Sequence, residues 1–333
     1  MLAFLAPGQG SQTPGMLADW LELPGAAERI AAWSDISGLD LARLGTTATA
    51  EEITDTAVTQ PLVVATTLLA YEEFFKRAAL ADKEDGDSPD FDLVVAGHSV
   101  GEIAAYAIAG VISADEAVAL ASTRGAEMAK ACALEPTGMS ALLGGDEDEV
   151  LARLDALDLI PANRNAAGQI VAAGTVSALE KLAEDPPARA RVRKLATAGA
   201  FHTRYMAPAL EGYATVADRI TPAEISETSG PNVTLLSNVD GQPVSSAADA
   251  MAKLVAQMTR PVRWDLCSAT IGRLFEHAAG TGATVAIVEF PPAGTLTGIA
   301  KRELKGVPAH PIKSPDDLDG IPATSVSLSG TTS

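Results

Sequence analysis

The sequence predicts an α/β fold with a largely parallel sheet, into which a small ferredoxin-like domain is inserted. Apolar strand-like segments alternate with helical patterns along nearly the whole chain, which is typical of a parallel sheet flanked by helices. The middle of the chain has the order β-α-β-β-α-β, which is typical of a ferredoxin-like domain. With 333 residues, 47% of them hydrophobic, the chain is long enough for a large domain that carries such an insertion.

The first part of the large domain, residues 1–132, begins with a buried strand and ends with a helix. Strands are predicted at 2–6 and 92–96, and helices at 61–79, 102–109 and 114–131. Ser113 and Glu116 form a capping box that starts the last of these helices. The acidic stretch 82–90 is predicted to form a turn region before the second strand.

The inserted domain is predicted to occupy residues 133–196. Its strands are expected at 139–144, 159–164, 169–173 and 191–196, and its helices at 146–157 and 177–183. A second capping box, Ser177 with Glu180, is expected to start the helix at 177–183.

The large domain resumes at residues 197–313. An amphipathic helix is predicted at 204–220, followed by a strand at 233–237, a helix at 247–258 and a strand at 284–289. From residue 314 the chain is polar, rich in Gly, Ser and Thr, and without periodicity. Residues 314–333 are therefore predicted to be a disordered tail.

Charge and composition exclude several classes of function. Twenty-four basic and 43 acidic residues give a net charge of −19, which excludes a general nucleic-acid binder and a binder of anionic membranes. The N-terminus lacks the basic region of a signal peptide, and no apolar run approaches the ~18 residues of a membrane helix. Cys132 and Cys267 are too few for a disulfide framework, so we expect a cytoplasmic protein. The scattered histidines and cysteines have no metal-ligand spacing, so no metal is expected.

The pentapeptide 97–101, Gly-His-Ser-Val-Gly, is the strongest catalytic signal. It follows an apolar strand and precedes a helix of small residues, which is the context of a nucleophile elbow. Glycines are needed there because the strand-to-helix turn is tight and side chains at Gly97 or Gly101 would clash. Ser99 is therefore predicted to be a nucleophile, and the N–H of Val100 at the helix N-terminus favours a developing oxyanion.

A serine nucleophile needs a base, and the sequence offers four histidines. His98 is next to the serine and is expected to point away from the elbow, while His277 lies on a predicted helix. His202 follows the inserted domain where the chain re-enters the large domain, and His310 lies in a loop near the C-terminus. The residues themselves do not choose between His202 and His310.

Arg124 lies on the apolar face of its helix, together with Ala117, Ala121 and Met128. A buried arginine must be paired, because an isolated buried charge costs several kcal/mol. Its partner is either an acidic residue in a structural salt bridge or the carboxylate of a substrate.

Other polar residues are weaker candidates for the site. Gly8-Gln9-Gly10 follows a strand, but Thr13 stands where a dinucleotide fingerprint needs glycine, so Gln9 is either an oxyanion donor or a turn residue. Asn163 and Asn165 either line a cleft or satisfy a turn. Seven basic residues form either a solvated face or a docking surface for an acidic partner: Arg189, Arg191, Arg193, Lys194, Lys301, Arg302 and Lys305.

Eight segments between residue 7 and about residue 300 form a highly specific set. They are PGQGSQ, TQPLVVAT, GHSVGEIAAY, TRGAEM, NRNAAGQIVAAG, AGAFHT, QMTRPVRW and EFPPAGTLTG. In these segments and in their order the chain resembles the malonyl-CoA:acyl-carrier-protein transacylase family of bacterial fatty acid synthesis. The resemblance implies an α/β-hydrolase-like large domain with a ferredoxin-like insertion.

The resemblance also implies a role for each matching residue. Ser99 matches the nucleophile, and His202 the base, so His310 drops out. Arg124 matches the arginine that binds the malonyl carboxylate, and Gln257 the residue whose backbone carbonyl orients the histidine. The backbone N–H groups of Gln9 and Val100 match the oxyanion hole, and Asn163 matches a pocket asparagine.

The implied reaction transfers malonyl from malonyl-CoA to acyl carrier protein through a malonyl-serine, without a cofactor, in a monomeric enzyme of fatty acid or polyketide synthesis. Phe201 and Val100 match the pattern of related enzymes that prefer malonyl over methylmalonyl. A methylmalonyl-preferring transferase, a serine thioesterase or hydrolase, and a carrier-binding scaffold without activity are the alternatives. Pro291-Pro292-Ala293-Gly294 departs from the family's Gly-Pro-Gly turn.

Overall fold

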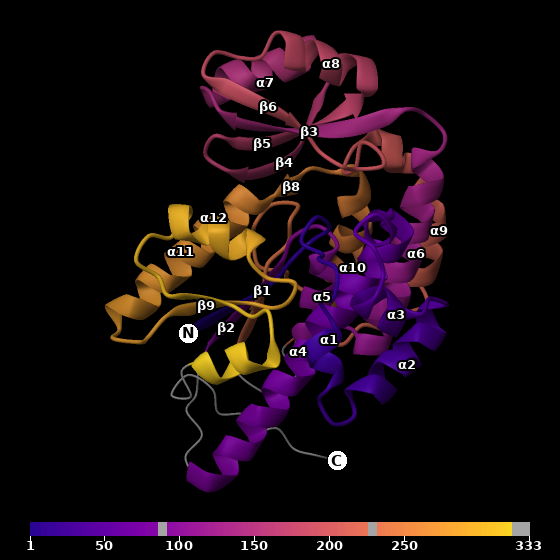
Figure 1. Ribbon diagram of the computed structural model, residues 1–333. Helices are drawn as coiled ribbons and strands as arrows, with labels where there is room; N and C mark the ends of the chain where they lie inside the picture. The colour runs from indigo at the N-terminus through magenta and orange to yellow at the C-terminus, as the bar shows by residue number, and fades with distance from the viewer. Residues whose placement is uncertain (86–91, 226–231, 322–333) are drawn as a thin grey trace.

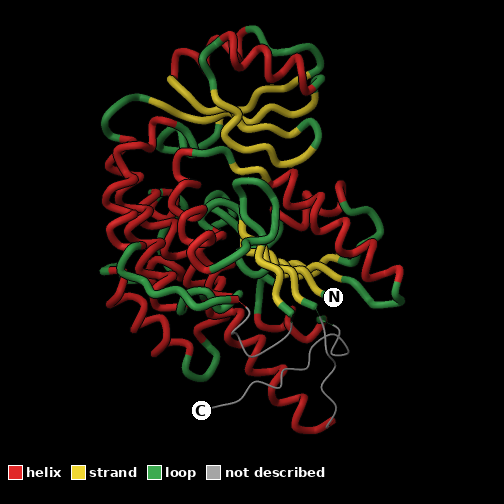
Figure 2. The backbone as a smooth tube through the Cα atoms, turned by 180° about the vertical axis from the view of Figure 1, so that it is seen from behind, coloured by secondary structure: helices red, strands yellow, loops and turns green. Residues whose placement is uncertain are grey.

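Two five-stranded sheets organise the chain in a computed structural model that describes residues 1–85, 92–225 and 232–321. Figure 1 shows the smaller unit, with β3 to β6, α7 and α8, above the larger one, and Figure 2 shows the two sheets as separate groups of strands. The observed architecture is the α/β fold that the sequence predicts.

The first sheet is parallel and has the order β10-β9-β1-β2-β7. Its strands are β1 (Leu2–Ala6), β2 (Leu93–Gly97), β7 (Val233–Leu235), β9 (Ala286–Glu289) and β10 (Ala309–Pro311). Every residue of β1, β2 and β9 is buried, because helices cover both faces of the sheet.

Alternate residues of β1 pack into two different cores. Leu2 and Phe4 face one cluster together with residues of the helices labelled α1 to α6, α9 and α10 in Figure 1. Ala3 and Leu5 face a second cluster, which contains residues of α11 and α12. The central strand therefore fixes the two helical layers to each other.

The helices of the larger unit fall on these two sides. The first layer contains α1 (Ala18–Leu21), α2 (Ala26–Ser37), α3 (Leu41–Thr46), α4 (Thr56–Asp85), α5 (Gly101–Ile108), α6 (Ala114–Cys132), α9 (Leu210–Ala217) and α10 (Ala247–Ala256). The second contains α11 (Trp264–Gly280) and α12 (Thr295–Glu303). The capping box of Ser113 and Glu116 is present at the start of α6, as the sequence predicts.

The second sheet has the order β6-β3-β5-β4-β8. It contains β3 (Thr137–Gly144), β4 (Ile160–Ala166), β5 (Gln169–Thr175) and β6 (Ala190–Lys194), with α7 (Glu147–Ala156) and α8 (Val176–Glu184) between them in sequence. These elements give the predicted β-α-β-β-α-β order, and all lie within 133–196. The two-residue strand β8 (Val262–Arg263) comes from the later chain and pairs in parallel with β4, which joins the two units.

Two predicted helix starts are wrong. Helix α4 begins at Thr56 rather than at Pro61, because a proline this near the start deletes only one bond of the helical ladder. The same helix continues to Asp85, so the predicted turn region 82–90 is helical at its start, and 86–90 lie outside the described residues. Helix α8 is capped by Thr175, whose side chain accepts the N–H of Ala178, and not by a box at Ser177.

Two later predictions also need correction. The predicted helix at 204–220 starts as a 3-10 helix, Arg204–Ala209, and becomes α9 only after Pro208, which has no N–H for the α-helical ladder. The predicted tail is ordered at its start, where 3-10 helix Pro315–Gly320 has a capping box and buries Leu318. Residues 322–333 of that tail lie outside the described residues.

The turn from β2 into α5 depends on two glycines, as the sequence predicts. A Cβ at Gly97 would lie 2.0 Å from the carbonyl oxygen of Gly101, and one at Gly101 would lie 2.2 Å from that of Ala6. Both obstacles are backbone atoms, so neither can be relieved by a rotamer change.

Gly97→Ala is therefore expected to destabilise the protein by about 3 kcal/mol, because the β2–α5 turn must open to admit the methyl group. Chemical denaturation measures this. Gly298→Ala is the control, since nothing lies within 4 Å of a Cβ at that position of α12. Equal stability of the two variants would contradict the close packing at the turn.

Candidate active site

Ser99 lies at the carboxyl end of β2, immediately before α5. Its backbone φ is +55°, a left-handed conformation that strains a non-glycine residue and is typical of a nucleophile elbow. The backbone N–H of Ser99 donates to Asn238 Oδ1 at 2.8 Å, which holds the strained turn in place.

His202 is the histidine that reaches Ser99. Its Nε2 is 2.7 Å from Ser99 Oγ, and its Nδ1 is 2.9 Å from the backbone carbonyl oxygen of Gln257. A carbonyl oxygen only accepts, so Nδ1 carries the hydrogen and Nε2 keeps the lone pair that accepts the serine hydroxyl. Gln257 therefore orients the imidazole through its main chain.

The imidazole of His202 stays neutral near neutral pH. It is only 2% exposed, and burial, assisted by the positive charge of Arg124, lowers its pKa to about 3. A neutral ring next to the serine hydroxyl is the protonation state that a general base requires.

The other histidines have different surroundings. His98 is bonded to Asn165 and lies edge-on to Trp264, and burial lowers its pKa. His277 is in the last turn of α11, and His310 is on the edge strand β10.

Arg124, on α6, is a buried cation among neutral partners. It is 1% exposed, and its Nη1 and Nη2 donate to the side-chain oxygens of Gln60 at 2.8 Å and Gln257 at 2.9 Å. Nη2 is also 3.5 Å from Ser99 Oγ. Burial lowers the pKa of Arg124, and no ion pair joins it to an acidic side chain of the described residues.

The structural salt bridge considered for Arg124 is therefore not observed within the described ranges. A guanidinium whose partners are amides keeps its positive charge unneutralised next to Ser99, and its Nε has no partner among the described residues. Such a group can bind a carboxylate.

Three further residues contact the site without a local sequence signal. Gln60 of α4 binds Arg124, while Glu102 and Asn238 bind the Gln257 side chain at 2.5 and 3.3 Å. The contact between Glu102 and Asn238 spans 136 positions of sequence, so spacing alone could not find it. Glu102 follows Ser99 by one turn of helix, which is the one available hint.

The turn around Gln9 lies against the elbow. A Cβ at Gly8 would be 2.5 Å from the carbonyl oxygen of His98, and the side chain of Gln9 donates to Thr56 at 3.3 Å. Val100 is fully buried at the start of α5. The oxyanion role of these two N–H groups stays a prediction.

Phe201 is buried next to His202, and Asn163 is buried on β4, where its Oδ1 has no partner among the described residues. Their roles in a substrate pocket stay predictions. Asn165, at the end of the same strand, accepts from or donates to His98 at 2.9 Å.

The seven basic residues do not form one continuous strand or helix. Arg191, Arg193 and Lys194 are exposed on β6, which is the outer edge of the second sheet. Arg302 of α12 instead binds Gln169 at the start of β5.

The turn at Pro291-Pro292 is the segment whose sequence differs from the family pattern. Thr67 donates to the carbonyl oxygen of Pro291, and the carboxylate of Glu289 accepts the N–H of Gly294, so both ends of the turn are held.

The described ranges contain no group of three or more His, Cys, Asp or Glu side chains that could hold a metal ion. Cys132 and Cys267 are free. None of the described helices is both long enough and apolar enough to span a bilayer.

Comparison with known proteins identifies relatives that match most of the chain. Residues 3–311 match the family described as acyl transferase domain. The chain is 73% identical over 306 residues to the malonyl CoA-acyl carrier protein transacylase of Mycolicibacterium smegmatis, covering 92% of this chain and 99% of that one. The corresponding protein of Mycobacterium bovis is 69% identical over 321 residues, covering 96% and 99%.

Solved structures of transacylases have the same fold as this chain. The crystal structure of MCAT from Mycobacterium tuberculosis has a TM-score of 0.87 at 67% identity, covering 98% of this chain and 99% of that one. A type II PKS acyl-carrier protein in complex with its malonyl-transacylase has a TM-score of 0.79 at 29% identity, covering 96% and 97%.

The low pKa of His202 predicts that its ring stays neutral between about pH 8 and about pH 5. The unfolded chain takes up this proton near the ordinary value of 6.5, but the folded protein does so only near 3, so the free energy of unfolding falls as the pH drops below about 6.5. A ring NMR titration, with His202→Gln to assign the signal, tests this. A midpoint near the ordinary value would contradict it.

Proposed function

The chain belongs to the acyl transferase domain family, and on that premise we infer that it is an enzyme that transfers a malonyl group from malonyl-CoA to acyl carrier protein. The observation that carries this assignment is the contact of Ser99 Oγ with His202 at 2.7 Å beside the buried cation of Arg124. A dyad of this kind performs acyl transfer, and the cation selects an acyl group that ends in a carboxylate.

The first half-reaction acylates the enzyme. His202 Nε2 takes the proton of Ser99 Oγ, which attacks the thioester carbonyl of malonyl-CoA. The resulting oxyanion accepts hydrogen bonds from the backbone N–H groups of Gln9 and Val100. The carbon–sulfur bond then breaks, His202 returns its proton to the leaving thiolate, and coenzyme A departs.

Arg124 holds the malonyl carboxylate during this step. Its Nη2 lies 3.5 Å from Ser99 Oγ, so a carboxylate bound there is close to an acyl carbon attached to Ser99. The planar guanidinium presents two parallel N–H donors, which suit a carboxylate better than a neutral acyl end. Phe201, next to the base, and Asn163 are assigned to the walls of the acyl pocket.

The second half-reaction transfers the acyl group to the carrier. His202 deprotonates the phosphopantetheine thiol, the sulfur attacks the malonyl ester, and the proton on His202 passes to Ser99 as the ester bond breaks. The enzyme returns to its starting state, so the kinetics are ping-pong. Each bond change uses the dyad and backbone donors, so the proposed reaction takes no metal and no cofactor.

The carrier is the macromolecular partner in this assignment. Fatty acid synthesis is its setting, since the relatives named above carry acyl carrier protein in their names, and the complex with a type II PKS carrier supports polyketide synthesis as a second setting. We propose a monomer, because the groups assigned to the reaction come from one chain. Two free cysteines support a reducing, cytoplasmic setting.

Brief mixing with malonyl-CoA is expected to add one malonyl group to Ser99, observed by intact-protein mass. Ser99→Ala should gain nothing, and phosphopantetheinylated carrier should discharge the adduct from the wild type. A hydrolase would instead lose the adduct to water without carrier, and a methylmalonyl-preferring transferase would label faster with methylmalonyl-CoA. A carrier-binding scaffold would show no adduct while still binding carrier.

Arg124→Ala is expected to lower the ratio of malonyl-CoA to acetyl-CoA labelling rates by about 100-fold, because removing one partner of a buried charge pair costs about 3 kcal/mol. The ratio is measured on one preparation and does not depend on its active fraction. Arg43→Ala removes an arginine that is paired with Glu52 on the surface and serves as the control. An unchanged ratio in Arg124→Ala would refute the carboxylate clamp.

A further inference from the structure

Glu102 is a buried carboxylate that the proposed reaction does not use. It lies in the first turn of α5, three positions after Ser99, and its side chain is 0% exposed. Its two oxygens accept hydrogen bonds from different donors. Oε1 accepts the backbone N–H of Asn238 at 2.7 Å, and Oε2 accepts the side-chain Nε2–H of Gln257 at 2.5 Å. These two residues connect it to the reacting groups.

The first connection runs through the amide of Gln257. Arg124 has only donors and an ionised carboxylate only accepts, so an amide between them has one orientation: Oε1 toward Arg124 and Nε2 toward Glu102. The same Nε2 also donates to the backbone oxygen of Ser99 at 3.0 Å. The backbone carbonyl of Gln257 accepts from His202, and its side-chain oxygen accepts from Arg124. A fixed position of Gln257 therefore orients both His202 and Arg124.

The second connection runs through Asn238. Its side chain accepts the N–H of Ser99 at 2.8 Å and donates to the carbonyl oxygen of Gly97 at 2.7 Å, so it spans both ends of the strained elbow. The backbone N–H of Asn238 donates to Glu102, which lies on α5, the helix that follows the elbow. This bond holds Asn238 in place.

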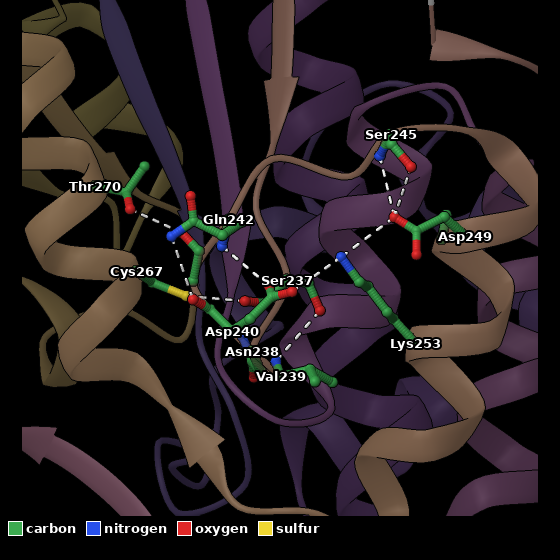
Figure 3. Close-up of polar contacts among 12 residues, drawn as sticks. Ser237, Asn238, Val239, Asp240, Gln242, Ser245, Asp249, Lys253, Cys267 and Thr270 are labelled. Carbon is green, nitrogen blue, oxygen red and sulfur yellow. Dashed lines mark hydrogen bonds and ion pairs between the residues drawn. The ribbon is translucent and has the colours of Figure 1, made fainter.

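The loop that carries Asn238 is anchored on its other side. Thr270 donates to the carbonyl oxygen of Gly241 at 2.8 Å, and Cys267 contacts that of Ser237 at 3.4 Å. Lys253 pairs with Asp240 at 3.1 Å, and Figure 3 shows it between Asp240 and Asp249. Asn238 therefore has little freedom to follow a displaced elbow.

We propose that Glu102 is a positioning residue for malonyl transfer, which orients Arg124 and His202 through Gln257 and holds the Ser99 elbow through Asn238. The inference rests on the proposed function, because it concerns the selection of a malonyl group by that site. Glu102 itself touches no reacting atom.

The ionised carboxylate is the form that performs this task. Burial raises the pKa of Glu102 to about 7, against the N–H of Asn238, the amide of Gln257, the hydroxyl of Ser237 and the positive charge of Arg124, which all favour the ionised form. Both oxygens face N–H donors, so a hydroxyl hydrogen on either one would be directed at a donor.

Glu102→Gln tests the orientation with little change of shape. The oxygen of the new amide can accept a hydrogen bond from one of the two N–H donors. Its NH2 group then faces the other donor, and no hydrogen bond can form between two donors. Because the Asn238 donor belongs to the backbone and cannot turn, Gln257 must rotate, and its Oε1 then leaves Arg124. The variant is therefore expected to lower the ratio of malonyl-CoA to acetyl-CoA labelling rates by about tenfold.

Glu289→Gln is the matched control. Glu289 is also 0% exposed, and its carboxylate accepts the backbone N–H groups of Gly294, Leu296 and Thr297 on α12. This variant loses a buried carboxylate outside the site and is expected to keep the wild-type labelling ratio. A merely structural loss lowers both rates through the active fraction and leaves the ratio unchanged.

Glu102→Asp provides a second test should Glu102→Gln not fold. The shorter side chain keeps the negative charge but places it one methylene further from Gln257. The ratio of malonyl-CoA to acetyl-CoA labelling rates should therefore fall again, whereas Glu289→Gln should have the wild-type ratio. A folded variant of Glu102 with the wild-type ratio would overturn the inference. Absence of malonyl labelling in the wild type would instead refute the proposed function, so the two failures are distinguishable.

Discussion

The guanidinium of Arg124 carries its charge inside the protein, and no carboxylate of the residues that the structure describes is in direct contact with it. Its hydrogen bonds go to amide oxygens of Gln60 and Gln257, which come from α4 and from the 3-10 helix Gln257–Thr259 after α10. Removing a charge from water costs several kcal/mol, and neutral acceptors offset only part of this. In the proposed reaction a malonyl carboxylate supplies the counter-charge, so the desolvation cost of the guanidinium favours binding of an acyl group that carries a carboxylate.

The fold brings this cation and Ser99, the proposed nucleophile, together at the carboxyl end of the parallel sheet. Ser99 follows the carboxyl end of β2, which is where open α/β sheets bind their ligands. The proposed base, His202, lies in the segment that follows β6, and its φ of +59° shows that it is also held in a left-handed conformation. Two strained residues in contact mark a site that the surrounding packing must hold, and Asn238 and Gln257 supply that support.

Much of the site could be predicted from local sequence because its signals are local. The glycines around Ser99 are required by the short turn 97–101, and the burial of Arg124 follows from the spacing of apolar residues on one helix. His202 could not be chosen over His310 from the residues themselves, and the resemblance to a family made that choice. Glu102, Asn238 and Gln60 escaped prediction because the contact of Gln60 with Arg124 spans 64 positions of sequence and that of Glu102 with Asn238 spans 136.

Errors in the fold have similar physical origins. The sequence pattern of residues 204–220 is amphipathic throughout, yet Pro208 divides it into a 3-10 helix and α9. The polar stretch after residue 314 contains too few apolar residues to reveal that Leu318 is buried against the first core. The division at Pro208 follows from the missing proline N–H, which a hydrophobic periodicity does not register. The burial of Leu318 depends on tertiary packing, which the periodicity does not contain either.

Arg124 has no ionic partner among the described residues, and in the proposed function this leaves it able to hold the substrate carboxylate. A crystal structure of the malonyl-Ser99 enzyme tests this role. Both carboxylate oxygens are expected within about 3 Å of the guanidinium nitrogens, with the Arg124 contacts to Gln60 or Gln257 lengthened. A malonyl carboxylate directed away from Arg124, with both amide contacts unchanged, would contradict it.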